Sequence, residues 1–185
     1  MTRLHLGCGK RYLAGYDHVD LSEYSHIKYN TPIFPLPYIS DDSIDEIYCS
    51  HALEYFDFTD CLSALKDWHR ILKPNGGQLR LSVPDFDKLL KVYALNNCQI
   101  EAIIGPLFGK WPVNSTLTVY HKTVFTQTML TRLLQESGFA SIEEWNPFVF
   151  HGQDENSFDD YSKACFPHMA FETGMLISLN LMAVK

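Results

Sequence analysis

A glycine turn that follows a short apolar segment near the amino terminus constrains this chain more than any other feature. Leu4-His5-Leu6 precedes Gly7-Cys8-Gly9, and a second short segment ends at Asp20. A strand that stops at a glycine turn exposes backbone N–H groups, and glycine lets a ligand come close to them. A carboxylate at the end of the neighbouring strand can accept hydrogen bonds from both hydroxyls of a ribose. The pattern predicts a nucleoside site in an α/β sheet, although an isolated G-x-G turn can also be purely structural.

The spacing around this turn separates three kinds of nucleotide site. A dinucleotide fingerprint needs a third glycine where this chain has Tyr12, whose bulk would obstruct the packing of a helix against the strand. A phosphate-binding loop ends in Gly-Lys-Ser/Thr, but Gly9-Lys10-Arg11 lacks the hydroxyl that would contact magnesium. What remains is a short turn for a nucleoside that carries no pyrophosphate.

Composition and charge set the outer limits on structure and ligands. The 185 residues are 46% hydrophobic, which is enough for the core of one domain spanning 1–185. The 22 acidic and 15 basic residues leave a formal charge of −7, which disfavours a nucleic-acid surface. The five cysteines lack the spacing of a zinc site or a disulfide framework, so no metal is expected. Because no signal peptide and no apolar run of about 20 residues is present, we expect a cytoplasmic protein without membrane contact.

Strands and helices alternate along the chain, which predicts a parallel sheet covered on both faces. The expected strands are 4–6, 16–20, 26–29, 44–49, 78–83, 140–145 and 175–184, and the expected helices are 60–72, 85–96 and 126–137. The connection 10–15 is too short for an ordinary crossover, so a single turn or a loop is expected in place of the first helix. Residues 105–120 show no periodicity and are expected to form a loop or lid beside the site. Residues 151–173 form an insertion whose structure the sequence does not indicate.

Five segments between Leu4 and about Asp85 have the order and spacing of one enzyme family. They are Leu4-His5-Leu6-Gly7-Cys8-Gly9, Val19-Asp20-Leu21, Leu36-Pro37 with Asp42-Ser43-Ile44-Asp45-Glu46-Ile47, Ser50-His51-Ala52-Leu53-Glu54, and Ile71-Leu72-Lys73-Pro74-Asn75-Gly76-Gly77. In these segments the chain resembles the class I S-adenosylmethionine-dependent methyltransferases, especially short predicted members related to the type 11 group. The resemblance implies a doubly wound, Rossmann-like, mostly parallel seven-stranded sheet that ends in an antiparallel hairpin.

The resemblance also implies S-adenosylmethionine as the cofactor and assigns residues to its parts. Gly7, Cys8 and Gly9 would lie against the methionine portion, and Asp20 would hold the ribose hydroxyls. Asn30 stands where the family usually has an aspartate near the adenine, and its amide still offers both a donor and an acceptor. The full set of expected cofactor-binding residues is Leu6, Gly7, Cys8, Gly9, Asp20, Leu21, Asn30, Ser50 and His51.

Methyl transfer from a sulfonium is an in-line displacement that mainly requires alignment of donor and acceptor. If the acceptor is a hydroxyl, a side chain must take its proton, and histidine suits this role near neutral pH. The candidates are His51 and His121, with Asp85 as a third, although each can also be a structural or surface residue. We expect a small-molecule acceptor, in a pocket walled by aromatic side chains drawn from Phe108, Trp111, Tyr120 and Phe125.

Two other classes of function stay open at this point. The reduced first helix, Asn30, and Tyr55 in place of a histidine that related sequences carry are also compatible with a non-catalytic module that binds a protein partner. A nicotinamide oxidoreductase of similar architecture is disfavoured by Tyr12.

Overall fold

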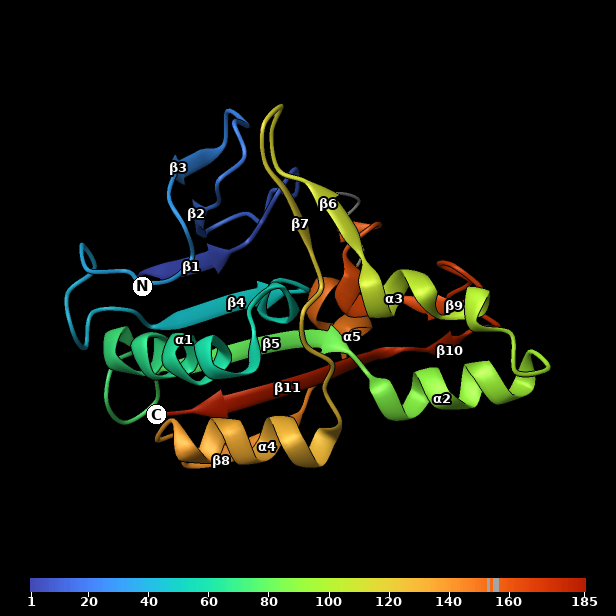
Figure 1. The fold of residues 1–185 in the computed structure, drawn as a ribbon. Helices are drawn as coiled ribbons and strands as arrows, with labels where there is room; N and C mark the ends of the chain where they lie inside the picture. Colours follow the sequence, from blue (N-terminus) through green and yellow to red (C-terminus); the bar gives the residue numbers. More distant parts are fainter. Residues whose placement is uncertain (153, 155–156) are drawn as a thin grey trace.

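A seven-stranded sheet forms the centre of the computed structural model, which describes residues 1–152, 154 and 157–185 (Figure 1). Its strand order is β3-β2-β1-β4-β5-β11-β8. The strands are β1 (Arg3–Leu6), β2 (Asp17–Val19), β3 (Ile27–Tyr29), β4 (Glu46–Ser50), β5 (Gln78–Pro84), β8 (Ser141–Glu144) and β11 (Ser178–Val184). The first five strands are parallel, while β11 is antiparallel to both β5 and β8. The predicted fold class, including the closing antiparallel hairpin, is therefore confirmed.

The order of the strands reverses at β1, which lies between β2 and β4. Leu6 is in register with Val19 on one side and with Cys49 on the other, so the three strands end side by side. Ligands of open parallel sheets bind outside the carboxyl ends of the strands at such a reversal. The turns after β1, β2 and β4 are therefore brought to one edge of the sheet.

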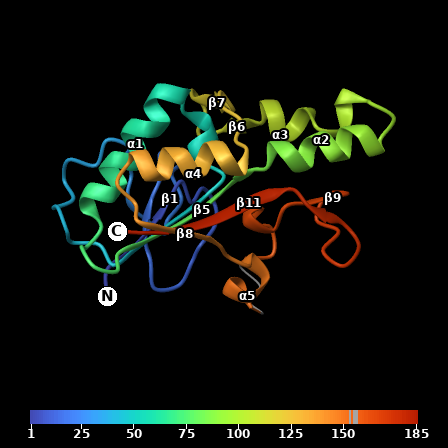
Figure 2. The same cartoon turned by 90° about the horizontal axis from the view of Figure 1, so that it is seen from below.

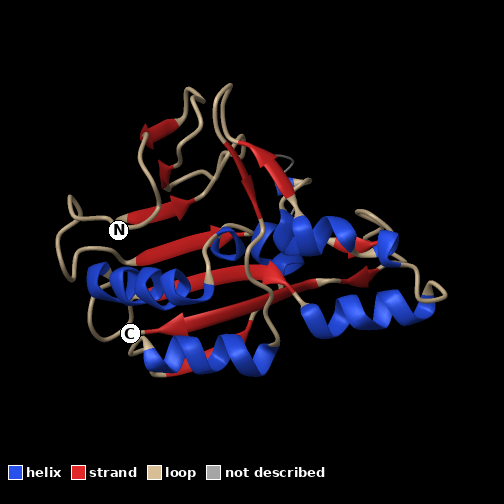
Figure 3. Ribbon diagram, in the orientation of Figure 1, coloured by secondary structure: helices blue, strands red, loops and turns tan. Residues whose placement is uncertain are grey.

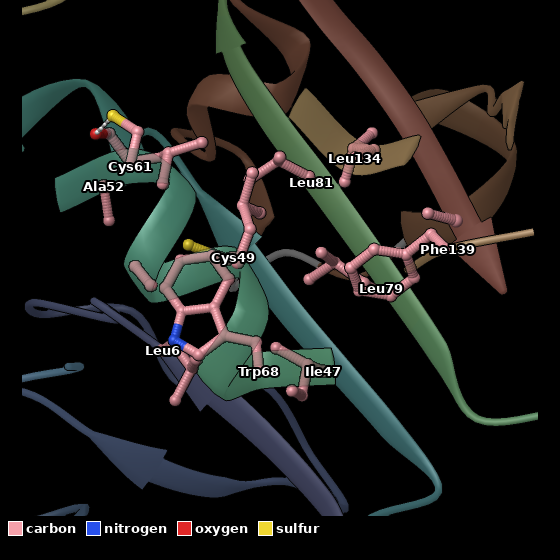
Figure 4. Packing of buried hydrophobic residues seen from close by; sticks show 14 of the residues in the cluster. Leu6, Ile47, Cys49, Ala52, Cys61, Trp68, Leu79, Leu81, Leu134 and Phe139 are labelled. Carbon is pink, nitrogen blue, oxygen red and sulfur yellow. Dashed lines mark hydrogen bonds between the residues drawn. The ribbon is translucent and has the colours of Figure 1, made fainter. Parts of the chain in front are cut away.

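Helices α1 (Phe58–Ile71), α2 (Phe86–Leu95) and α4 (Gln127–Glu136) lie on one side of the sheet (Figures 2 and 3). Helix α1 is capped by Asp57, whose carboxylate accepts hydrogen bonds from the free N–H groups of Thr59 and Asp60. Its Trp68 is fully buried and packs between Leu6 of β1 and Ile47 of β4 (Figure 4). These three helices correspond to those expected from the sequence. None of the described helices is both long enough and apolar enough to cross a membrane.

The opposite face of the sheet is covered more thinly. Residues 10–16, all within the described part of the chain, form turns and coil, as the short connection predicted. Helix α5 (Pro147–His151) and the single 3-10 turn η4 (Tyr161–Lys163) lie on this side instead (Figure 2). The face under them is aromatic and polar: the ring of Tyr48 is fully buried, and stacks on Phe150 with centroids 5.3 Å apart.

Two segments differ from the expectation drawn from the sequence. Residues 105–120 are not an irregular loop, because α3 (Ile104–Phe108) leads into an antiparallel hairpin of β6 (Lys110–Pro112) and β7 (Thr118–Tyr120). The expected strand 175–184 is two strands. Its first part, β10 (Met175–Leu176), pairs with β9 (Cys165–Phe166) inside the insertion, and only β11 joins the main sheet. Strands of two or three residues are too short to show a period in the sequence.

Candidate cofactor and active site

A cavity of about 700 Å³ opens at the carboxyl ends of β1, β2 and β4. The turns after these strands contribute Gly7, Gly9, Asp20, Leu21, Ser50 and His51 to its wall. The β6–β7 hairpin and the segment around η4 close its other sides with Trp111 and Tyr161. The volume is in the range of small-molecule and cofactor sites.

The turn after β1 favours glycine at both of its ends. Gly7 has a φ of 66° and Gly9 a φ of 52°, in the left-handed region that side chains disfavour. A Cβ on Gly7 would lie 2.5 Å from the Cβ of Ala52 at the end of β4. A Cβ on Gly9 would lie 3.4 Å from the ring of Trp111 in the hairpin. The absence of both side chains leaves backbone at the cavity wall, which is the condition for close approach of a ligand.

Asp20 ties the turns after β1 and β2 together. Its Oδ2 accepts a hydrogen bond of 2.8 Å from the Gly9 N–H, and its Oδ1 accepts one of 2.7 Å from the Ser22 N–H. The residue is 9% exposed and lines the cavity. Each carboxylate oxygen has a further lone pair, so both can still accept from a pair of ligand hydroxyls. The residues present therefore fit a ribose at this position.

Three of the expected cofactor-binding residues lie outside the cavity wall. Leu6 is fully buried in the core beneath the turn. Cys8 is buried, with its Sγ 3.9 Å from Nε2 of His26, and burial raises the pKa of its thiol to about 12. The amide of Asn30 donates to the carbonyl oxygens of Asp20 and Ser22 at 3.1 and 2.8 Å. Asn30 thus fixes the loop after β2, and its amide N–H₂ is already used there.

The end of β4 is anchored from the insertion by a residue that sequence reasoning missed. Asp160 is buried, and its Oδ1 accepts hydrogen bonds of 2.9 Å from both the Ser50 and the Tyr48 hydroxyls. Burial opposes ionisation of Asp160, but the neighbouring His151 and hydrogen bonds from Ser162 outweigh it and lower its pKa to about 2. Asp160 is therefore a carboxylate that holds the wall residue Ser50 in place.

His51 takes an unusual backbone conformation at the end of β4. Its φ is 52°, in the left-handed region that is unfavourable for most residues with a side chain. The ring lies in the cavity wall with Nε2 3.0 Å from the Ser178 hydroxyl. Its other nitrogen, Nδ1, lies 3.3 Å from Oε1 of Glu54.

His121 reaches the same cavity from the hairpin. Its Nδ1 lies 2.8 Å from the carbonyl oxygen of Pro106, and its ring packs edge-on against Tyr55 with centroids 4.7 Å apart. Its Nε2 lies 3.7 Å from the same Glu54 oxygen that faces His51. The two histidines predicted as catalytic candidates are thus brought together through Glu54, a residue the sequence analysis did not single out as a site residue.

Most of the other residues predicted to be at the site lie outside the cavity wall. Asp85, the third candidate base, lies outside the cavity wall: it caps α2 through the Lys88 N–H and forms an ion pair with the Lys88 ammonium at 3.1 Å. Of the four aromatic residues expected around the acceptor, Trp111 lines the cavity. Phe125 is fully buried in the core, and Phe108 and Tyr120 are more than half exposed.

Comparisons with known proteins bear on this geometry. Residues 4–79 match the sequence model of a family described as a methyltransferase domain. No curated protein matches the chain. An S-adenosylmethionine-dependent methyltransferase from Mesorhizobium loti has the same fold, with a TM-score of 0.55 and 19% identity over 100% of this chain and 90% of that one.

Two further solved structures are similar to the chain. The 1,6-didemethyltoxoflavin-N1-methyltransferase of Burkholderia thailandensis has a TM-score of 0.55 at 14% identity, over 100% of this chain and 70% of its own. A chain from the complex of the Haloferax volcanii Trm112 methyltransferase activator with a methyltransferase has a TM-score of 0.55 at 13% identity, over 99% and 81%.

The matched residues run from β1 to the start of β5 and include the glycine turn and Asp20. The resemblance to the class I S-adenosylmethionine-dependent methyltransferases is confirmed. The structure further disfavours the nicotinamide alternative. A dinucleotide pyrophosphate needs the N-terminus of a helix after β1, whereas residues 10–16 form described turns and coil.

Proposed function

We propose that this chain is an S-adenosylmethionine-dependent methyltransferase that acts on a small-molecule acceptor by in-line methyl transfer. The observation that carries the proposal is that Gly7, Gly9 and Asp20 share one cavity with His51 and His121. The first three are suited to hold a nucleoside, and the histidines are suited to handle a proton. A cofactor end and an acceptor end in one cavity are what a bimolecular transfer requires.

The chain's own residues would mainly bind and orient. S-adenosylmethionine, when bound, supplies an activated methyl group on its sulfonium. Asp20 would accept hydrogen bonds from the ribose, and the backbone between Gly7 and Gly9 would lie against the methionine portion. Ser50 and His51 would border the reacting end of the cofactor. The apolar side chains of Ile33 and Phe56 in the same wall would exclude water from it.

A small acceptor is favoured over a macromolecule by the shape and charge of the molecule. The hairpin and the insertion contribute to the walls around the cavity, which leaves a volume suited to small ligands rather than an open groove. The formal charge of −7 is unfavourable for a polyanion such as a nucleic acid. A structural neighbour is a methyltransferase named for a small heterocyclic substrate, which is consistent with this choice.

The test is a calorimetric titration with S-adenosylmethionine and with S-adenosylhomocysteine, followed by transfer of a tritiated methyl group into the small-molecule fraction of a cell extract. We expect both nucleosides to bind at one site and the label to appear in a compound that passes a membrane filter. If neither nucleoside gives a heat of binding, the result would instead favour a non-catalytic module that binds a protein partner. Label found only in protein or nucleic acid would contradict the small-molecule acceptor.

A further inference from the structure

Glu54 is a fully buried acidic residue whose carboxyl group faces two imidazole rings. It is 0% exposed, and within the described part of the chain neither of its carboxylate oxygens has a hydrogen-bond partner in good alignment. Its Oε1 lies 3.3 Å from Nδ1 of His51 and 3.7 Å from Nε2 of His121. Because a buried charge without compensation is costly, a proton on one of these rings stabilises the group.

The hydrogen-bond partners determine where the ring protons lie. The carbonyl of Pro106 can only accept, so Nδ1 of His121 carries a proton, and the neutral ring has a bare lone pair at Nε2. We assign the proton of His51 to Nδ1, facing Glu54, which leaves its Nε2 to accept from the Ser178 hydroxyl. Nε2 of His121 is then the ring nitrogen of this pair that is open to a further proton.

On the basis of the proposed function, we infer that His121 is the general base, that Glu54 is a positioning residue which stabilises the His121 imidazolium, and that the acceptor is a small apolar molecule with an acidic hydroxyl, a phenol or an enol. Three observations carry this inference: the buried Glu54 carboxylate, the open nitrogen of His121, and the position of both histidine rings in the cavity wall.

The chemistry of the base selects the class of acceptor. A neutral amine attacks a methyl group without first losing a proton, so it would not need this cluster. An aliphatic alcohol is too weak an acid for an imidazole near neutral pH, whereas a phenol or enol is within its reach. The cavity wall also contains Pro84, Ala164 and Ile177, which suits an acceptor with an apolar body.

The proposed step balances in protons and electrons. His121 takes the hydroxyl proton at Nε2 while the acceptor oxygen forms its bond to the methyl carbon and the bond from that carbon to sulfur breaks. The electron pair of the broken bond stays on sulfur, which becomes a neutral thioether. The imidazolium formed at His121 is paired with Glu54 until the proton passes to water.

The titratable groups that face His121 come from three directions. Glu54 and Tyr55 approach it from η1 (Leu53–Tyr55), and His51 lies beyond Glu54 at the end of β4. Lys122 follows it in the chain and also lines the cavity. On the side of α3 its contacts are the backbone of Pro106 and Gly109. Among these groups, Glu54 is the one whose carboxyl oxygen faces Nε2 of the His121 ring.

The experiment uses 4-nitrophenol, a phenol that ionises near neutral pH and absorbs visible light as the phenolate. The complete chain is saturated with S-adenosylhomocysteine and with the probe, and the phenolate absorbance is followed as the pH is raised from 6, where most of the free probe is protonated. The same titration is repeated with His121→Gln, with Glu54→Gln, and with His69→Gln as a control histidine on α1 outside the cavity wall. Circular dichroism confirms that each variant is folded.

We expect the bound probe to absorb as phenolate with the wild-type chain and with His69→Gln, and to lose that signal with His121→Gln. With Glu54→Gln we expect the midpoint of the phenolate absorbance to move about one pH unit higher than in the wild type, because transfer of the probe's proton to His121 becomes about tenfold less favourable. No phenolate signal with the wild type, or an unchanged midpoint with Glu54→Gln, would overturn the inference. If S-adenosylhomocysteine binds but the probe gives no phenolate signal, the inference about His121 is wrong while the proposed function still stands. If S-adenosylhomocysteine does not bind, the proposed function itself is wrong.

Discussion

The backbone N–H of Gly9 donates a hydrogen bond of 2.8 Å to Oδ2 of Asp20, and through this bond the turns after β1 and β2 form one surface. The carboxylate therefore has two tasks in this account, since it holds the glycine turn and would also bind the ribose. Removing its charge should affect the binding of a nucleoside more than it affects the rest of the sheet.

The substitution Asp20→Ala is expected to weaken binding of S-adenosylhomocysteine by roughly 1.5 to 3 kcal/mol, the cost of losing a charged hydrogen-bond acceptor. Calorimetric titration measures this change. Asp17→Ala is the control, because Asp17 begins the same strand but pairs with Lys28 outside the cavity. Equal affinities in the wild type and in Asp20→Ala would show that the ribose is bound elsewhere.

Gly7→Ala is expected to destabilise the fold. The new Cβ would lie 2.5 Å from the Ala52 Cβ, and the φ of 66° is itself unfavourable, so we expect a loss of more than about 1 kcal/mol. Gly15→Ala is the matched control, since its φ of 82° carries similar strain but nothing lies within 4 Å of the added carbon. Urea unfolding compares the two, and equal losses would mean that the contact with Ala52 does not matter.

The buried ring of His5 predicts a dependence of stability on pH. Burial, reinforced by the neighbouring His18, lowers the pKa of His5 from 6.5 to about 3. Below pH 6.5 the His5 ring is protonated in the unfolded chain but stays neutral in the folded chain. The contribution of His5 to the free energy of unfolding is therefore fully present above this pH and decreases as the pH falls. At pH 5 the loss from this one ring is about 2 kcal/mol.

Urea unfolding between pH 5 and pH 8 measures this loss. His5→Phe should reduce the dependence over that interval, because phenylalanine does not titrate and has a similar ring. His18, whose pKa burial lowers to about 4, contributes a dependence of the same sign that remains in the variant. Asp160, whose pKa is about 2, ionises below this window and does not obscure it. The same slope in the variant and in the wild type would contradict the role given to His5.

Trp111 should report on occupation of the cavity. Its ring lies against Gly9 in the cavity wall, whereas Trp68 and Trp145 are buried outside that wall. We expect S-adenosylhomocysteine to change the tryptophan fluorescence, and we expect Trp111→Phe to remove most of that change while Trp145→Phe retains it. A full response in Trp111→Phe would place the ligand away from the hairpin.

Local pattern was enough to predict most of the sheet and its main helices. The apolar spacing in 60–72 and the proline that follows it indicated α1, and Trp68 is a core residue in the structure as its position in the apolar stripe suggested. The glycine turn and Asp20 could be predicted as site residues from the sequence because each directly follows a strand. Features that depend on neighbours in the chain were therefore accessible from the sequence.

Features that depend on distant contacts were not accessible. In the sequence Glu54 is one residue of a segment shared with the family. Only the structure shows that His121, which follows the hairpin, lies next to it. Asp160 likewise becomes an anchor for Ser50 because the insertion crosses the face left open by the reduced first helix. The hairpin itself has strands of three residues, which are too short for a period to appear.

The most direct test of the central claim is a crystal structure of the chain with S-adenosylhomocysteine. The account predicts the nucleoside across the ends of β1, β2 and β4, with its ribose hydroxyls within hydrogen-bond distance of the Asp20 carboxylate and its sulfur near Ser50 and His51. A ligand bound with Asp20 facing away from its sugar, or a cavity empty at saturating ligand, would contradict it.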